Sequence, residues 1–276
     1  MAHKPPIEAA PKSWLSAAFK AGSTTTLQPK HAPTAVSAAA SRPVVRPQNR
    51  LFAKAAPTPT GMGLDSSRVR DRMIQRIAAQ GTDHPAVLSA LASVERHRFV
   101  DSALVNQAYE DTSLPIGLGQ TISKPSVVAR MLALLLEHTA APLGRVLEIG
   151  TGCGYQAAVL SFIAGEVYSM ERLKGLHDKA RANLRSLQRP NIHLLFGDGF
   201  AGYPTGGPYA AIISAAGGVS VPQTWIDQLA IGGRLVAPTQ TPGGQQSLVV
   251  IDKTSTGVVK QVLEPVLFVP LKSGVG

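Results

Sequence analysis

The amino-acid sequence predicts a protein of the α/β class, built on a doubly wound, mostly parallel sheet. The main observation is that apolar strand-like runs alternate with amphipathic helical segments, a pattern typical of parallel strands joined by helical crossovers. The last strand-like runs follow one another closely, which indicates an antiparallel addition at the carboxyl end. The expected helices span about 126–138, 155–164, 172–187 and 222–230, and the expected strands about 145–149, 166–170, 192–196, 210–214, 234–238, 246–252, 258–263 and 266–270.

Two N-terminal helices are expected before this alternation. Asp65 or Ser66 can cap a helix whose apolar residues share one face, and Gly81 ends it. A second short helix is expected to begin near Pro85. The stretch from Phe99 to Lys124 is predicted to be irregular, because it is too apolar for a linker and too rich in Gly and Pro for a helix. Long loops of this kind are usually functional.

The first 64 residues differ in composition from the rest of the chain. Residues 1–60 contain eight of the 27 Lys/Arg residues and one of the 17 Asp/Glu residues, so they hold most of the net charge of +10. Such a basic, Ala/Pro/Ser-rich segment cannot bury enough apolar surface to offset its ordering entropy. We therefore expect residues 1–64 to be a disordered extension and residues 65–276 to form one domain. A solvated tail, weak contact with anionic partners and a targeting role stay open for the extension.

The cysteines and histidines indicate which cellular compartment suits the protein and whether it has a metal site. Cys153 is the only cysteine, which excludes an intramolecular disulfide and fits a reducing compartment. We expect a cytoplasmic monomer, and no apolar run approaches the ~18 residues that a membrane span needs. The seven histidines lack a ligand-like spacing, so no metal site is expected. His177 and His193 are interpreted as exposed helix and strand-edge residues.

A glycine-rich loop follows the strand expected at 145–149. Gly150, Gly152 and Gly154 leave this loop without side chains, so that a ligand can lie against bare backbone at the start of the next helix. A dinucleotide fingerprint would require glycine at position 155, which is Tyr155. The run from Glu148, Glu-x-Gly-x-Gly-x-Gly, instead resembles the first motif of the Rossmann-like methyltransferases, which bind S-adenosylmethionine. The resemblance implies a Rossmann-like fold and this cofactor.

Acidic residues close three successive strands of the predicted sheet. Glu148 ends the first strand, Glu171 ends the second 23 residues later, and Asp198 with Gly199 follows the third. Ligands of open parallel sheets bind beyond the carboxyl ends of the strands, and an acidic group about 20 residues after the glycine loop meets ribose hydroxyls in nucleoside-binding folds. We therefore expect Glu171 at the ribose and Asp198 and Gly199 at the adenine.

Motifs outside the glycine loop point to a narrower family. From about residue 67 to 273 the chain resembles protein-L-isoaspartate (D-aspartate) O-methyltransferases, which repair damaged aspartyl and asparaginyl sites. The matching motifs are Leu114-Pro-Ile-Gly, Gln120-Thr-Ile-Ser123, Val146-Leu-Glu-Ile-Gly-Thr-Gly, Gly197-Asp-Gly, Ile231-Gly-Gly-Arg-Leu and Phe268-Val-Pro-Leu271.

The resemblance implies roles for individual residues. Ser123 corresponds to the active-site serine, and Gln120, Thr121, Ile122 and Ser123 form the segment that closes over the cofactor. Glu148 and Glu171 take the cofactor-binding acid positions. Two positions depart from the family pattern. Ser126 stands where relatives have His or an aromatic residue, and Ala210 stands where relatives have Asp, a change that either weakens cofactor binding or removes a strand-edge hydrogen bond.

The implied reaction needs no general base. An isoaspartyl α-carboxylate has a pKa near ~4 and is ionised at neutral pH, so the site has only to align it with the methyl donor. The implied substrates are damaged proteins and peptides that contain isoaspartyl or D-aspartyl residues. Two alternatives stay open: a methyltransferase of this family with a changed acceptor, and a noncatalytic adaptor that binds nucleic acid. The adaptor is disfavoured, because the basic segment lacks interleaved aromatic residues.

Overall fold

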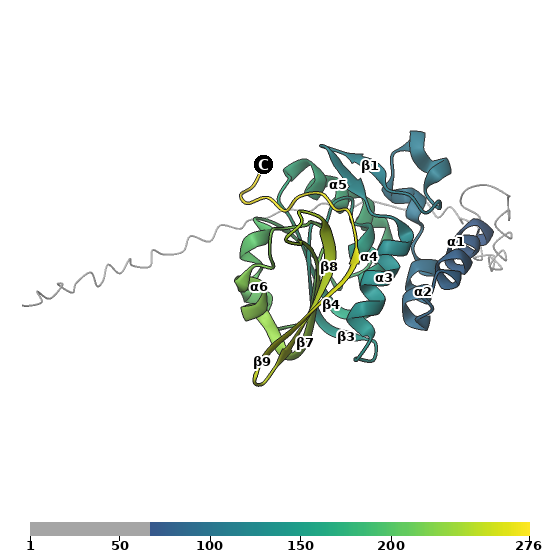
Figure 1. The fold of residues 1–276 in the computed structure, drawn as a ribbon. Coiled ribbons are helices and arrows are strands. Elements are labelled where there is room, and N and C mark those ends of the chain that lie inside the picture. Colours follow the sequence, from purple (N-terminus) through teal and green to yellow (C-terminus); the bar gives the residue numbers. More distant parts are fainter. Residues whose placement is uncertain (1–66) are drawn as a thin grey trace, which may run out of the picture. The chain divides into compact units, whose positions relative to one another are not determined.

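The computed structural model describes residues 67–276, and its centre is one seven-stranded sheet (Figure 1). The strand order is β5-β4-β3-β6-β7-β8-β9, and the five strands from β5 to β7 are parallel. The expectations for residues 1–64, and for a cap at Asp65 or Ser66, lie outside the described residues. The strands are β3 (Leu143–Ile149), β4 (Ala164–Glu171), β5 (Ile192–Phe196), β6 (Tyr209–Ser214), β7 (Leu229–Gln240), β8 (Gln246–Thr254) and β9 (Gly257–Pro265).

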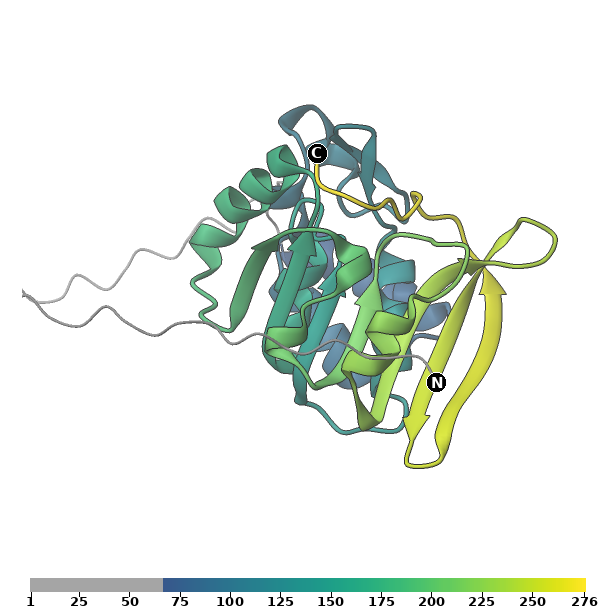
Figure 2. The ribbon, with the colours of Figure 1, turned by 90° about the vertical axis from the view of Figure 1, so that its left-hand side faces the viewer.

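The carboxyl-terminal strands form the expected antiparallel addition, with one correction. β8 pairs antiparallel with β7, and β9 pairs antiparallel with β8 (Figure 2). The strand expected at 266–270 does not form, and only Pro270 makes an isolated bridge, with Gly217. This segment instead crosses the carboxyl edge of the sheet, where Val269 accepts a hydrogen bond from Gly217 at 2.8 Å and Leu271 donates one to Gly217 at 2.8 Å.

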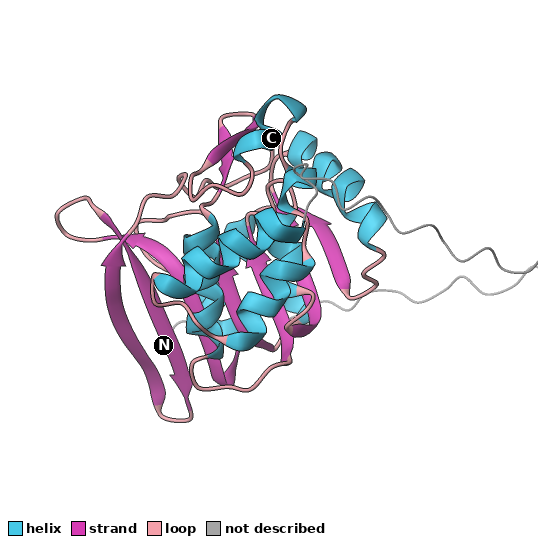
Figure 3. Ribbon diagram, turned by 90° about the vertical axis from the view of Figure 1, so that its right-hand side faces the viewer, coloured by secondary structure: helices cyan, strands magenta, loops and turns pink. Residues whose placement is uncertain are grey.

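Helices cover both faces of the sheet. One face packs against α3 (Pro125–Leu136), α4 (Tyr155–Leu160) and α5 (Lys174–Leu184), as Figure 3 shows. α1 (Ser67–Ala79) and α2 (Pro85–Ser93) pack in turn against α3 and α4. The other face packs against α6 (Gln223–Gln228), whose Trp225 is fully buried. α2 and α3 begin at proline, which fits the first helical turn because no amide hydrogen is needed there. Neighbouring residues of one strand point to opposite faces, as Val146 and Leu147 do in β3.

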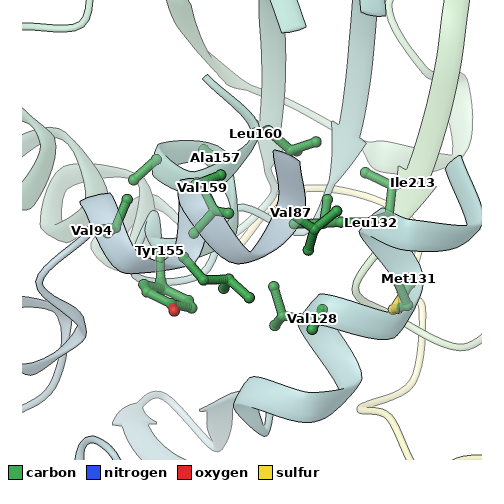
Figure 4. Close-up of a cluster of buried hydrophobic side chains, with 14 of the residues drawn as sticks. Val87, Val94, Val128, Met131, Leu132, Tyr155, Ala157, Val159, Leu160 and Ile213 are labelled. Carbon is green, nitrogen blue, oxygen red and sulfur yellow. The ribbon is translucent and has the colours of Figure 1, made fainter. Parts of the chain in front are cut away.

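The helix that follows the glycine loop is fixed by the core. Every residue of α4 is buried, and Figure 4 shows Tyr155, Val159 and Leu160 among side chains of α2 and α3. α4 ends at Leu160, four residues before the expected end at 164. Burial on all sides holds the start of this helix, and with it the glycine loop, against the sheet.

The stretch that we expected to be irregular is partly ordered into secondary structure. The 3₁₀ helix Arg96–Phe99 leads into it, and it contains the 3₁₀ helix Ser102–Gln107 and a hairpin of β1 (Leu114–Gly117) and β2 (Gln120–Ile122). The hairpin tip is Gly117-Leu118-Gly119, with φ angles of 97°, 52° and 69°. Gly117 and Gly119 adopt these left-handed angles easily. Because a turn of this kind interrupts the two short strands, the sequence shows no helix or strand periodicity there.

The expectation for His177 was wrong, since its side chain lies inside. His177 is on the inner face of α5, is 3% exposed and has its ring centroid 5.8 Å from that of Phe196. His193 is half-exposed on the edge strand β5, where it contacts Glu166 at 2.5 Å. No helix within residues 67–276 has the length and apolar character to cross a membrane.

Candidate active site

A cavity of about 230 Å³ lies at the carboxyl ends of β3 and β4. This is the switch point of the sheet, because β3 has β4 on one side and β6 on the other, and ligands of doubly wound folds bind there. The structure brings eight of the sequence-predicted site residues to the cavity wall. These are Gln120, Thr121, Ile122, Ser123, Gly150, Gly152, Glu171 and Gly199.

The glycine loop forms the floor of the cavity in a conformation that suits glycine. Gly150, Gly152 and Gly154 have φ angles of 89°, 57° and 90°. A Cβ atom on Gly152 would lie 3.1 Å from the Ile116 side chain, so a larger residue would fill the space between loop and hairpin. Gly154 is not on the wall. It precedes α4, and a Cβ there would press on Leu184 at 3.1 Å, so its role is to pack the loop against α5.

Glu171 connects the end of β4 to the glycine loop. Its Oε2 accepts a hydrogen bond from the Gly152 amide at 2.9 Å, and its Oε1 accepts one from the Leu173 amide at 2.9 Å. The side chain is buried on the cavity wall. A carboxylate oxygen accepts more than one hydrogen bond, so Glu171 keeps capacity to accept from two neighbouring hydroxyl groups of a ligand.

Glu148 lies beneath the cavity rather than on its wall. The carboxyl group is fully buried, accepts a hydrogen bond from Ser169, and leaves Oε1 without a partner among the described residues. Ser169 also shares a 2.6 Å hydrogen bond with Thr151 of the glycine loop. Burial raises the pKa of Glu148 to about 8, partly offset by the hydrogen bond from Ser169. Glu148 therefore supports the loop from below through Ser169.

We expect Glu148→Gln to stabilise the protein increasingly as pH rises from 5 to 8. The folded protein holds the Glu148 proton more tightly than the unfolded chain, whose carboxyl pKa is near 4.5, so wild-type stability falls as pH passes from that value to about 8. The neutral amide escapes this loss, which amounts to a few kcal/mol. Thermal unfolding of the wild type and of Glu148→Gln, without ligand at pH 5, 7 and 9, measures this difference in stability. A stability difference that is constant over this range would contradict the buried carboxyl.

Asp198 holds the main chain instead of facing the cavity. Its Oδ1 accepts from the Phe200 amide at 2.9 Å and its Oδ2 accepts from the Gly274 amide at 2.7 Å. Gly199 does line the cavity, and a Cβ on it would lie 2.6 Å from the Ile149 side chain. Glycine is therefore required at 199, while Asp198 anchors the chain near residue 274 over this end of the cavity.

Cys153 lines the cavity without the properties of a nucleophile. Its side chain is buried, and burial raises the pKa of the thiol to about 11. The thiol is protonated at neutral pH and packs as a small apolar group. Residues 67–276 contain no group of three or more His, Cys, Asp and Glu side chains that could hold a metal ion.

A second cavity of about 460 Å³ adjoins the first. Its walls come from the β2–α3 junction and from the segment 265–269, and they are largely apolar, including Val127, Val266 and Phe268. The two cavities share four wall residues, which are Thr121, Ser123, Ala215 and Val269. Ser123 therefore stands where the cavities meet, so that groups bound in each would be neighbours.

The two departures from the family pattern lie away from the cavity walls. Ser126 donates its amide to Asp111 at 2.9 Å and its hydroxyl to the same carboxylate at 2.8 Å, at the start of α3. Ala210 lies near the amino end of β6, next to Gly144 and on the opposite edge from the cavity. Of the two effects considered for Ala210, the structure thus favours loss of a strand-edge hydrogen bond.

Several wall residues were not singled out from the sequence. Met170 is in β4 next to Glu171, Leu173 and Leu176 follow that strand, and Ile116 and Leu118 come from the hairpin. Their only sequence signal is nearness to Glu171 and to the Leu114-Pro-Ile-Gly motif. Residues 269–272 complete the wall, and the sequence had indicated this segment only as the family motif Phe268-Val-Pro-Leu271.

The family model for protein-L-isoaspartate(D-aspartate) O-methyltransferase matches residues 68–276. This chain belongs to that family. A protein-L-isoaspartate O-methyltransferase of Methylibium petroleiphilum is 56% identical over 240 residues, covering 84% of this chain and 89% of the relative. One of Leptothrix cholodnii is 59% identical over 217 residues, covering 78% and 77% respectively.

Solved structures agree with this membership in the family. A protein-L-isoaspartate O-methyltransferase, 28% identical, aligns with a TM-score of 0.68 over 75% of this chain and 67% of its own. Another, from Plasmodium falciparum in complex with S-adenosyl-L-homocysteine, is 24% identical and has a TM-score of 0.65, covering 74% and 98%. The predicted Rossmann-like methyltransferase fold and the family resemblance are confirmed by these matches.

Proposed function

We propose that this enzyme transfers a methyl group from S-adenosylmethionine to the free carboxylate of L-isoaspartyl and D-aspartyl residues in damaged proteins. The observation that carries the proposal is the meeting of two cavities at Ser123, one floored by the glycine loop and one walled by apolar residues. Family membership supports the same activity, since the relatives at 56% and 59% identity are named for it.

The first cavity fits the cofactor by the chemistry of its wall. The bare backbone at Gly150 and Gly152 gives room for a methionyl group, and the Glu171 carboxylate suits the two ribose hydroxyls. Gly199 leaves space for the adenine ring. Glu148 is buried beneath the cavity, where a cationic ligand would favour the ionised form of its carboxyl, against the protonated form that burial favours. The bound cofactor supplies an electrophilic methyl group on a sulfonium.

Ser123 is the residue that we assign to the acceptor. The attacking isoaspartyl carboxylate is already ionised at neutral pH, so no proton has to be removed from it. The Ser123 hydroxyl donates a hydrogen bond to one carboxylate oxygen and leaves the other free to face the methyl group. Alignment of this kind contributes up to ~7–11 kcal/mol to lowering a barrier. The apolar walls of the second cavity exclude water from the carboxylate.

The methyl ester leads to repair by chemistry that needs no further group of the enzyme. The main-chain nitrogen after the isoaspartyl residue attacks the ester carbonyl and loses its proton, and methanol leaves as the succinimide ring closes. Water then opens the ring at either carbonyl, and one of the two products is normal aspartate. Because the acceptor lies within a main chain, we expect substrates to be extended, flexible peptide segments.

Methyl transfer to a matched pair of peptides tests the proposed function. The two peptides differ only in having isoaspartate or aspartate at one position, and the cofactor carries a labelled methyl group. We expect base-labile label in the isoaspartyl peptide alone. Equal labelling of both peptides would indicate a changed acceptor, and cofactor binding without labelling of either would refute the activity.

The domain boundary, oligomeric state and location are part of the same proposal. We propose that residues 65–276 form the methyltransferase domain and that residues 1–64 are a separate extension, because the family match begins at residue 68. We also propose a monomer in the cytoplasm, where a protein with the single thiol of Cys153 meets reducing conditions. Nucleic acid is not among the proposed partners.

Deletion of residues 1–64 tests the boundary. We expect the shortened protein to keep its kcat and KM for the isoaspartyl peptide within about twofold, because both cavities are built from residues 113–272. Steady-state kinetics of the full chain and the deletion variant, at two salt concentrations, measure this. A loss of turnover after deletion would show that the extension contributes to the active site.

A further inference from the structure

Arg96 is a buried cation that connects three parts of the site. Its side chain is 0% exposed. Nε donates to the Ala108 carbonyl at 2.8 Å, and Nη2 donates to the Ser123 carbonyl at 2.7 Å. The guanidinium carbon lies 4.7 Å from the centre of the Tyr155 ring, within the range of a cation–π interaction.

The burial of Arg96 lowers the stability of the fold unless other interactions compensate for it. No carboxylate of residues 67–276 lies within ion-pair distance of the guanidinium, and burial lowers its pKa against the opposing effect of Tyr155. Removing a cation from water costs several kcal/mol, and apolar replacement of buried charges is often neutral or stabilising. If this position were needed only for packing, an apolar side chain would therefore give a more stable protein.

Its contacts lie at the two halves of the proposed reaction site. Ser123 lines both cavities, and Tyr155 is the cavity-lining residue that begins α4 directly after the glycine loop. The turn after Ser123 is also held from its other end, where Asp111 accepts hydrogen bonds from the amide and hydroxyl of Ser126. Arg96 holds the serine end of this turn against the cofactor end of the site.

We propose that Arg96 is a positioning residue for methyl transfer, which fixes the Ser123 backbone relative to the glycine loop. This inference rests on the proposed function and assigns to Arg96 no contact with substrate or cofactor. Small displacements of aligned groups are expensive in such reactions, because the rate depends on their relative position. Loss of Arg96 should therefore lower kcat while leaving cofactor binding largely intact.

Arg96→Met and Arg96→Lys test this role, with Arg234→Met as the matched control. Arg234 is also a buried arginine, but it pairs with Glu137 and Asp252 away from both cavities. We expect Arg96→Met to lower kcat about 10- to 100-fold, no more than Ser123→Ala does, with less than a fivefold change in cofactor Kd, and Arg96→Lys to recover part of the loss. Arg234→Met should lower stability without this change in kcat.

A double-mutant cycle with Ser123→Ala separates positioning from general destabilisation. If Arg96 acts through Ser123, the loss of kcat caused by Arg96→Met should shrink to less than fivefold once the hydroxyl is gone. Equal losses in both backgrounds would overturn the proposal. Arg96→Lys enters the same cycle and serves alone should Arg96→Met not fold.

Amide hydrogen exchange of residues 121–128 gives a readout that does not depend on activity. We expect faster exchange of these amides in the Arg96 variants, and unchanged exchange in Arg234→Met. Unchanged exchange in the Arg96 variants would overturn the role of Arg96. If exchange is faster in the Arg96 variants as expected, but the wild-type protein fails to methylate the isoaspartyl peptide, the proposed function is refuted and the contact made by Arg96 is not.

Discussion

Ser123→Ala is expected to lower kcat for the isoaspartyl peptide by about 10- to 100-fold, because one hydrogen bond to a charged group contributes ~1.5–3 kcal/mol. The cofactor Kd should change little, since we assign the hydroxyl to the acceptor carboxylate and the cofactor to the glycine loop and Glu171. Single-turnover methyl transfer and calorimetric titration with S-adenosylhomocysteine measure the two quantities separately.

Ser113→Ala is the control for this variant. Ser113 is an exposed hydroxyl on the wall of the same second cavity, but it does not line the first. Its loss should leave kcat within about twofold, since such surface substitutions change little. If Ser123→Ala turned over as fast as Ser113→Ala, the junction of the two cavities would not be where the acceptor is aligned.

Glu171→Ala is expected to have the largest effect on cofactor binding, raising the Kd by about 100-fold or more. The variant removes the proposed acceptor of two ligand hydroxyls, each contributing ~1.5–3 kcal/mol, and it frees the Gly152 and Leu173 amides that Glu171 now binds. The Kd of Glu171→Gln should lie between those of the wild type and Glu171→Ala, because the amide retains one acceptor oxygen. Calorimetry with S-adenosylhomocysteine measures each Kd.

Glu166→Ala gives the matched control on the same strand. Glu166 is a half-exposed carboxylate of β4, five residues before Glu171, and pairs with His193 on the edge strand. We expect its loss to leave the cofactor Kd unchanged within about twofold, because exposed ion pairs contribute little. Equal weakening by Glu166→Ala and Glu171→Ala would show that Glu171 does not contact the ligand.

The fold could be predicted from the sequence because its parallel strands are short apolar runs separated by helices of regular period. The errors fell where backbone hydrogen bonding decides the outcome. The segment 266–270 has the apolar character of a strand, but it pairs only at an isolated bridge to Gly217, and Pro270 has no amide hydrogen with which to extend a ladder. The hairpin at 114–122 escaped prediction since its three-residue tip, including Leu118, has only positive φ angles.

The candidate site was predictable to the extent that the carboxyl ends of parallel strands meet at one edge. Glu148, Glu171 and Asp198 all lie near that edge, but sequence position alone could not distinguish their surroundings. Glu171 reaches the cavity wall, Glu148 is buried below it, and Asp198 binds main-chain amides. These differences depend on side-chain direction and on segments distant in sequence, such as Gly274. The binding roles of all three stay predictions.

Arg96 shows a further limit of the sequence pattern. It lies in a short 3₁₀ helix, 27 residues before Ser123, and nothing in its neighbourhood distinguishes it from a surface arginine. Only the tertiary structure reveals that the side chain is buried and directed at the Ser123 carbonyl. Such contacts between distant segments leave no local periodicity, so residues that act through others are the hardest to find from sequence.

The central claim is that acceptor and methyl donor meet at Ser123, and a ternary complex tests it most directly. A crystal structure with S-adenosylhomocysteine and an isoaspartyl peptide should show the cofactor product against the glycine loop and Glu171. It should also show the peptide in the second cavity with its free carboxylate hydrogen-bonded to the Ser123 hydroxyl. A peptide bound elsewhere, or a carboxylate directed away from both Ser123 and the sulfur atom, would contradict the claim.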